Sequence, residues 1–182
     1  MSGPGRYAEV RPQVLSRIAL LVVTGLVAHV AILHRPRFLG ASPDTMLLVT
    51  IVAALETGSQ LGAAVGFASG MGLDLVSTGT PLGLRALVFT IVGWGVGYVR
   101  DHAFPGAERV PFALVALASI AGTALYGGSL MLARGVTTAA LDHLSLTVGV
   151  VALMNAVLSP IARPAVRRLL GVNWNDPVDR RV

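Results

Sequence analysis

The sequence contains no cysteine and no lysine, and it is poor in charged and aromatic residues. The lack of cysteine excludes disulfide bonds, thiol catalysis and cysteine-metal sites. Only 13% of the 182 residues are charged, whereas soluble domains carry ~25%. In contrast, 54% are hydrophobic and the mean hydropathy is +0.73. This composition is typical of an integral membrane protein.

The residue patterns that carry enzyme chemistry are also lacking. The four histidines show no metal-ligand spacing, and the chain has no phosphate-binding loop, no Ser-His-Asp order and no paired carboxylates on one face. We therefore expect no enzyme, no metal and no cofactor. All 14 basic residues are arginine and the net charge is +5. Because most arginines flank apolar segments, this charge does not indicate nucleic-acid binding.

Six apolar segments predict an all-α integral membrane protein with six transmembrane helices in one bundle. About 20 apolar residues are needed to cross ~30 Å of hydrocarbon. The segments cover about residues 16–33, 44–57, 61–76, 82–99, 111–133 and 141–158. The second is short, so it crosses only if residues 38–43 extend it; otherwise its neighbours must shield it. Residues 1–160 thus form one transmembrane domain, and residues 161–182 form an arginine-rich cytoplasmic tail.

The placement of arginine predicts the orientation. With six crossings, ten arginines lie on the side of the two termini and three lie on the other side. Because cytoplasmic loops are enriched in arginine, we expect a multi-pass protein of the bacterial inner (cytoplasmic) membrane with both termini in the cytoplasm. Five crossings would weaken this bias. No small-residue cleavage site follows the first apolar run, which predicts a retained anchor.

Glycine recurs every four residues in the third segment and the turn before it, at Gly58, Gly62, Gly66 and Gly70. Such a stripe lets another helix backbone approach closely. That helix belongs either to the same bundle or to a partner protein. The candidate partner-binding or structural groove consists of Gly62, Gly66, Gly70, Gly93 and Gly97.

Asp74 lies near the end of the same segment, and a carboxylate near a membrane interior usually faces a cavity or a partner. One interpretation is that Asp74 binds donors of the following turn, such as Ser77. The other pairs it with Arg85 in the next helix, which would fix the geometry of the hairpin. Thr80 is the expected N-cap of that helix, with Pro81 at its first position.

The second helix has a similar predicted start. Ser42 is the expected N-cap, Pro43 suits the first turn, and Asp44 meets the positive end of the helix dipole.

Three other polar residues have ordinary interpretations. Glu56 ends the second helix at a cytoplasmic turn, where exposure to water is expected. His29 and Asn155 lie within helices, where interhelical hydrogen bonds are expected. In the tail, residues 165–170 form either a short helix on anionic lipid heads or a frayed end.

The stretch from residue 42 to residue 100 contains four short motifs. They are the Pro43-Asp44 helix start, the Gly62 to Gly70 spacing, Gly-Leu-Asp-Leu at 72–75, and Pro-Leu-Gly at 81–83 followed by Arg-Ala-Leu at 85–87. With these motifs, the stretch resembles the bacterial rod shape-determining protein family MreD. The small size and the hydropathy profile also fit this family.

This resemblance implies a non-enzymatic membrane scaffold of the cell-elongation (rod) complex, which helps to organise lateral peptidoglycan synthesis and cell shape. The implied partners are the membrane helix of MreC, a class B penicillin-binding protein and a SEDS glycosyltransferase, with anionic lipid near the tail. The glycine groove would receive the MreC helix, and Asp74 with Arg85 would fix the outer hairpin. The family also looks like the substrate-binding subunits of energy-coupling-factor transporters, so the alternative function is a small-solute (vitamin) binding subunit.

Overall fold

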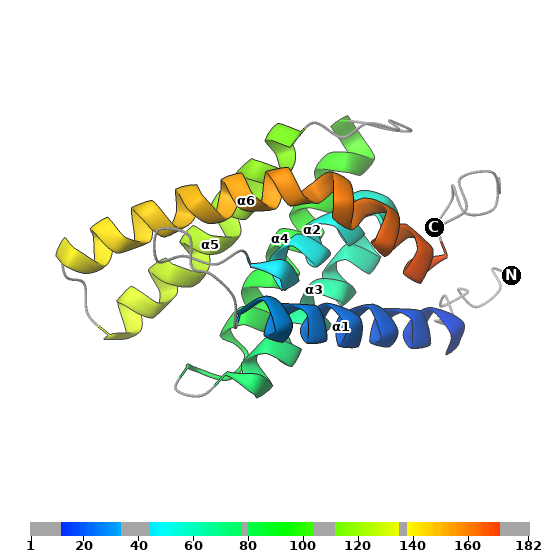
Figure 1. The fold of residues 1–182 in the computed structure, drawn as a ribbon, viewed down its shortest axis with the longest axis horizontal. Coiled ribbons are helices and arrows are strands. Elements are labelled where there is room, and N and C mark those ends of the chain that lie inside the picture. The colour runs from blue at the N-terminus through cyan, green and yellow to red at the C-terminus, as the bar shows by residue number, and fades with distance from the viewer. Residues whose placement is uncertain (1–11, 34–43, 78–79, 104–111, 135–137, 172–182) are drawn as a thin grey trace, which may run out of the picture.

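The computed structural model describes residues 12–33, 44–77, 80–103, 112–134 and 138–171, and these residues are organised as six α-helices without a strand among them. The all-helical expectation is therefore confirmed. The helices are α1 (Pro12–Leu33), α2 (Thr45–Thr57), α3 (Ser59–Val76), α4 (Leu84–Ala103), α5 (Phe112–Arg134) and α6 (Thr138–Leu170) (Figure 1).

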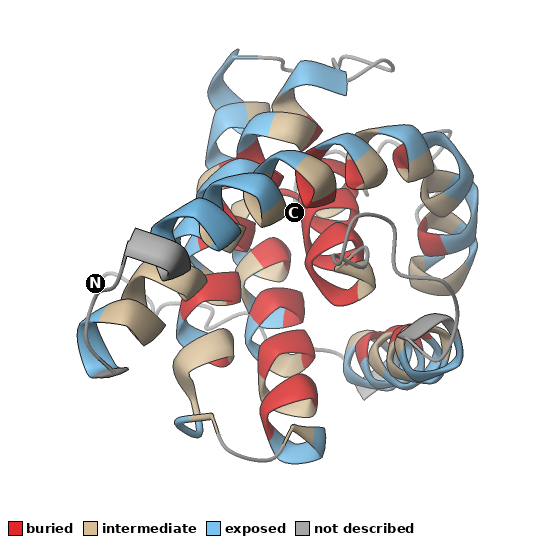
Figure 2. Cartoon of the chain, turned by 60° about the vertical axis from the view of Figure 1, so that its left-hand side comes forward, coloured by how far each residue is buried: buried red, intermediate tan, exposed pale blue. Residues whose placement is uncertain are grey.

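Helix α2 forms the centre of the core. It packs against each of the five other helices, and its residues from Met46 to Glu56 are all buried. Figure 2 shows the buried residues gathered on the inner helices, with exposed residues on the outer faces. The 13 residues of α2 rise ~20 Å, which is less than the ~30 Å of a bilayer core. Its neighbours shield it, in agreement with one of the two alternatives from the sequence.

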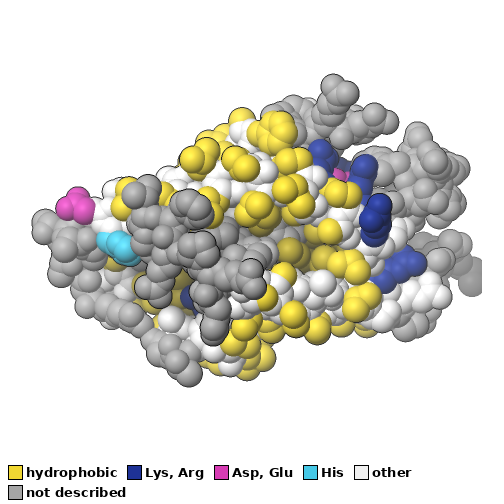
Figure 3. Space-filling model, viewed as in Figure 1, with side chains coloured by type: hydrophobic (Ala, Val, Ile, Leu, Met, Phe, Trp, Pro, Cys, Tyr) yellow, Lys and Arg dark blue, Asp and Glu magenta, His cyan; other side chains and the backbone are white. Residues whose placement is uncertain are grey.

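Three helices are long and apolar enough to cross a membrane. These spans are Gln13–Ala31 in α1, Phe112–Ala133 in α5 and Leu141–Leu170 in α6. On the face shown in Figure 3, hydrophobic side chains cover much of the surface, as expected of a protein whose outer solvent is lipid. Among the described residues, the other helices do not combine this length and hydropathy, so three spans are supported where the sequence predicted six.

Helix α6 is longer than predicted, because it continues through Pro160 and Pro164 to Leu170. Proline lacks the N–H that would bond the carbonyl four residues earlier. At Pro160 that carbonyl belongs to Ala156, and the Ser159 hydroxyl donates to it over 2.8 Å. This local bond compensates for the missing helical one.

The first ten residues of the predicted tail, 161–170, therefore belong to α6. Val166 is buried in the main hydrophobic core, so this part of the helix packs on the molecule. Residues 165–170 are helical as the end of α6 and not as a separate element. Residues 172–182 lie outside the described part of the chain.

Candidate functional site

The glycines of α3 form the seam along which α4 packs, and this is the most extensive helix pairing in the molecule. A Cβ atom added to Gly62 would lie 2.6 Å from the Ala54 Cβ and 2.7 Å from the Gly93 carbonyl oxygen. On Gly66 it would collide with the backbone of Phe89. Neither position has room for a side chain, because atoms of α2 and α4 of the same chain already occupy the space.

The same contacts exist in the opposite direction. A Cβ on Gly93 would collide with the Gly62 carbonyl, and one on Gly97 would collide with the Ser59 backbone; one on Gly70 would meet the backbone of α4. The hypothesis that these glycines receive the helix of a partner protein is wrong, because α4 of the same chain fills the groove. The alternative of packing inside the bundle is correct.

Asp74 lies at the end of α3, is 3% exposed, and binds the start of α4. Its Oδ2 accepts hydrogen bonds from the backbone N–H groups of Gly83 (2.8 Å), Arg85 (3.1 Å) and Ala86 (3.4 Å). The first N–H groups of a helix have no partner within it, and the helix dipole makes this end positive. Asp74 therefore caps α4 from the preceding helix.

The guanidinium of Arg85 does not pair with this carboxylate. It donates to the Ser77 hydroxyl over 2.5 Å and lies 4.6 Å from the ring centroid of Tyr126 on α5. The second carboxylate oxygen of Asp74 is buried without a hydrogen-bond partner. The predicted side-chain pair is wrong, because the backbone of α4 occupies Asp74. Arg85 instead connects the α3–α4 hairpin to α5 through a cation–π contact with the Tyr126 ring.

Thr80 and Pro81 do not start α4 as predicted. The helix begins at Leu84, and the Thr80 hydroxyl is buried without a hydrogen-bond partner. The capping bonds that Thr80 was expected to supply come from Asp74, which reaches the free N–H groups from across the hairpin.

At α2, the N-cap is Asp44, one position before the first helical residue. Its carboxylate accepts from the Leu47 N–H over 3.0 Å. The sequence assigned the cap to Ser42 and only a dipole contact to Asp44. Ser42 and Pro43 lie outside the described residues.

Glu56 forms a second polar site, which the sequence interpretation missed. Its side chain is fully buried, and each carboxylate oxygen binds one arginine of α6: Arg163 Nε lies 2.9 Å from Oε1, and Arg167 Nε lies 2.7 Å from Oε2. The expectation that Glu56 is solvated is wrong, because α6 continues past Pro160 and covers it. The sequence did hold a signal, namely the four-residue spacing of the two arginines, which places them on one helix face.

One end of the molecule, which we call the arginine end, contains Arg17, Arg163 and Arg167 together with the ends of α2 and α6 that they bind. Arg17 Nη1 of α1 donates to the Leu170 carbonyl at the end of α6 over 3.1 Å. The Ser59 N–H at the start of α3 donates to Asp101 Oδ2 near the end of α4, also over 3.1 Å. On the face shown in Figure 3, a group of arginine side chains lies where α1 begins and α6 ends.

The polar residues inside the helices differ in their bonding. Asn155 Nδ2 of α6 donates to the Ser119 hydroxyl of α5 over 3.2 Å, and both residues are buried, so the predicted interhelical bond is confirmed. His29 Nδ1 is buried without a hydrogen-bond partner.

Together, Asp74 and Glu56 bind helix ends and side chains of the chain itself. Asp74 joins the end of α3 to the start of α4, and Glu56 joins the end of α2 to α6. The helices therefore form one frame, in which the glycine contacts pack α3 on α4 and a carboxylate, Asp74 or Asp101, binds backbone N–H groups at each end of that pair.

Comparisons with known proteins give one match. A family model described as rod shape-determining protein MreD matches residues 12–172. No curated protein and no solved structure matches significantly. The matched region begins with α1 and extends just past the end of α6, so it covers every described helix. The chain therefore belongs to the MreD family of rod shape-determining proteins.

Proposed function

We propose that this protein is a non-enzymatic membrane scaffold of the bacterial elongation complex, where it binds MreC and helps to organise lateral peptidoglycan synthesis. Its family membership gives it a role in the determination of rod shape, and its long apolar helices fit a membrane protein. The observation that carries the proposal is the family match across the whole helical frame. A class B penicillin-binding protein and a SEDS glycosyltransferase are further proposed members of the same complex.

The proposed location is the inner membrane, with the arginine end in the cytoplasm. Arg17 binds the end of α6 there, and Arg163 and Arg167 bind the end of α2. Arginine enrichment marks the cytoplasmic side of bacterial membrane proteins. In this orientation both chain termini are cytoplasmic, the Asp74 hairpin faces outward, and α2, α3 and α4 complete a six-helix bundle.

The surface that we propose for the MreC helix is the outer face of α4. Leu87, Ile91, Trp94 and Tyr98 are between 46% and 59% exposed there. Their spacing of four, three and four residues is that of a helix that packs along another helix. Gly95 lies at the edge of this face, next to Trp94, and a Cβ there would meet nothing within 4 Å. A partner backbone can approach closely at such a position.

Affinity purification of the full chain from native membranes tests the proposal. Co-purification of MreC supports a scaffold of the elongation complex. Co-purification of an energy-coupling-factor ATPase module, without MreC, would contradict it and would favour the alternative of a small-solute binding subunit.

A further inference from the structure

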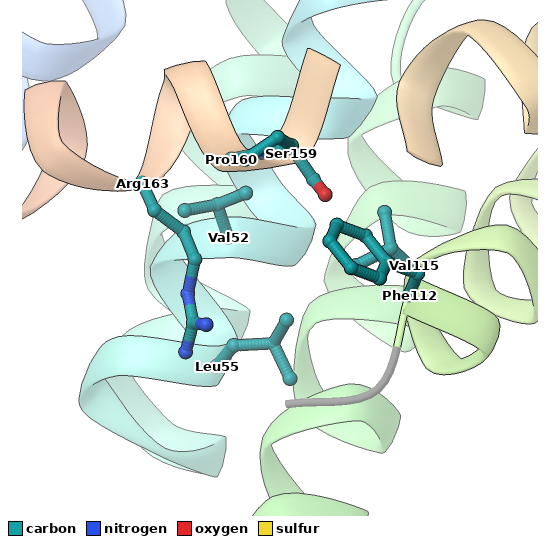
Figure 4. Close-up of a pocket in the computed structure, with 7 residues that line it drawn as sticks. All are labelled: Val52, Leu55, Phe112, Val115, Ser159, Pro160 and Arg163. Carbon is teal, nitrogen blue, oxygen red and sulfur yellow. The ribbon is translucent and has the colours of Figure 1, made fainter. Parts of the chain in front are cut away.

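A pocket of about 430 Å³ lies between α2, α5 and α6 near the arginine end. Its apolar wall consists of Val52 and Leu55 from α2 and of Phe112 and Val115 from α5. Arg163 of α6 lies on the side away from Phe112 and Val115, next to Val52 and Leu55, as Figure 4 shows. Ligand pockets in proteins measure ~300–1,000 Å³ and are mostly apolar with a few well-placed polar groups. This pocket fits that description.

Among the described residues that line this pocket, Arg163 alone is charged. It binds Glu56 through Nε, so both terminal amino groups lie outside that bond. Glu56 binds Arg167 through its other carboxylate oxygen, so Arg163 is bonded to Oε1 alone. Ser159, also in the lining, uses its hydroxyl on the Ala156 carbonyl. The pocket therefore attracts a negatively charged group at its Arg163 side.

One lining residue of the pocket also lies at the apolar outer surface of α5. Phe112 is the first residue of the apolar span of α5 and is 63% exposed. An acyl chain in the pocket would therefore lie beside the start of this span, with its head group at the level of the arginines. Arg168, which is exposed, lies within one turn of α6 from Arg167. Basic pockets between membrane helices on the cytoplasmic side are suited to anionic lipid heads.

We propose that this pocket binds one anionic phospholipid, with an acyl chain against Val52, Leu55, Phe112 and Val115 and with the phosphate beside Arg163. The site is separate from the α4 surface proposed for MreC, so either proposal can fail alone. Its ligand chemistry is an acyl chain joined to a negatively charged head group. A bound lipid of this kind would complete the contact between α2, α5 and α6.

Fluorescence quenching by brominated lipids tests the site. The full chain carries Phe112→Trp as the pocket reporter, with Trp94→Phe and Trp174→Phe to remove the native tryptophans. A matched chain carries Val23→Trp as the surface reporter on the lipid-facing side of α1, where the native residue is 58% exposed. Both are placed in vesicles of phosphatidylcholine with increasing fractions of brominated phosphatidylglycerol or brominated phosphatidylcholine.

At the pocket reporter, we expect quenching to show an about fivefold preference for phosphatidylglycerol over phosphatidylcholine. This ratio corresponds to the ~1 kcal/mol that one basic residue contributes. At the surface reporter, we expect no preference. Arg163→Gln abolishes the preference, whereas Arg163→Lys retains it. Val115→Phe fills the pocket without changing a charge and lowers quenching of the pocket reporter by both lipids. If Arg163→Gln does not fold, the quenching measured with Val115→Phe decides whether lipid occupies the pocket.

Equal quenching of the pocket reporter by the two lipids would overturn the proposal. So would a preference that Val115→Phe leaves unchanged. Loss of the preference when inorganic phosphate is added would also contradict it, because the site would then bind a free anion and not a lipid.

Discussion

Glu56 at the end of α2 and Arg163 in the last part of α6 form an ion pair of 2.9 Å, although 107 residues separate them. The glutamate side chain is fully buried, whereas that of the arginine is 24% exposed. This pair, with its neighbour Arg167, attaches the end of the longest helix to the central helix. Arg163 lies between the two prolines of α6 and Arg167 after them, so the two bonds hold this part of the helix against α2.

Glu56→Gln is expected to destabilise the protein by ~2–3 kcal/mol. Loss of one partner from a buried ion pair costs ~3–5 kcal/mol, and the partial exposure of both arginines reduces this value. Thermal unfolding of the purified protein in detergent measures the effect.

The control for this change is Asp101→Asn. Asp101 pairs with Arg100 at 3.1 Å, and both side chains are partly exposed. It also accepts the Ser59 N–H, a bond that the side-chain oxygen of asparagine can still accept. Exposed pairs contribute ~0–1 kcal/mol, so the unfolding temperature should change little. If Asp101→Asn were as damaging as Glu56→Gln, burial would not explain the importance of Glu56.

Asp74→Ala is expected to destabilise the protein by at least ~2 kcal/mol. The substitution leaves the N–H groups of Gly83, Arg85 and Ala86 without their acceptor, and each unsatisfied buried group costs ~1–3 kcal/mol. Hydrogen exchange of these amides, together with thermal unfolding, measures the loss.

Thr80→Val distinguishes the two possible caps of α4. A Thr N-cap contributes ~1 kcal/mol, but the Thr80 hydroxyl has no hydrogen-bond partner in the structure. We therefore expect Thr80→Val to leave the stability unchanged or slightly increased. A loss as large as that of Asp74→Ala would mean that Thr80 caps the helix after all.

Gly66→Ala is expected to disturb the α3–α4 seam, because a Cβ there collides with the Phe89 backbone. Overpacking of this kind typically costs ~1–3 kcal/mol. The matched change, Gly95→Ala, places a Cβ in open space on the other side of α4, so it should be neutral or slightly stabilising in a helix. Equal unfolding temperatures for the two variants would contradict the close packing of α3 on α4.

Hydropathy and local spacing predicted the helices well, because both depend on short stretches of sequence. The four-residue glycine spacing also identified the face on which α3 packs. It did not identify the occupant, since a groove of small residues suits the next helix and a partner helix equally. Only the position of α4 decided between them.

Side-chain partners that are distant in the sequence could not be predicted from it. Asp74 binds N–H groups up to 12 residues later, so local capping preferences pointed to Thr80 instead. Glu56 depends on residues more than 100 positions later. The predicted end of the sixth segment at residue 158 was too early, because hydropathy does not show that α6 continues through Pro160 and Pro164.

The central claim, that the chain is a scaffold for MreC, is tested most directly by its affinity for MreC in lipid nanodiscs. Two variants accompany the native chain: Gly95→Leu on the proposed α4 surface and Gly149→Leu on α6. A Cβ meets nothing within 4 Å at either position, so both changes should leave the fold intact. We predict that the native chain and Gly149→Leu bind MreC equally, whereas Gly95→Leu binds at least about tenfold more weakly, which corresponds to ~1.4 kcal/mol. Absence of binding by the folded native chain would contradict the scaffold function, and equal binding by all three would show that the α4 surface is not the interface.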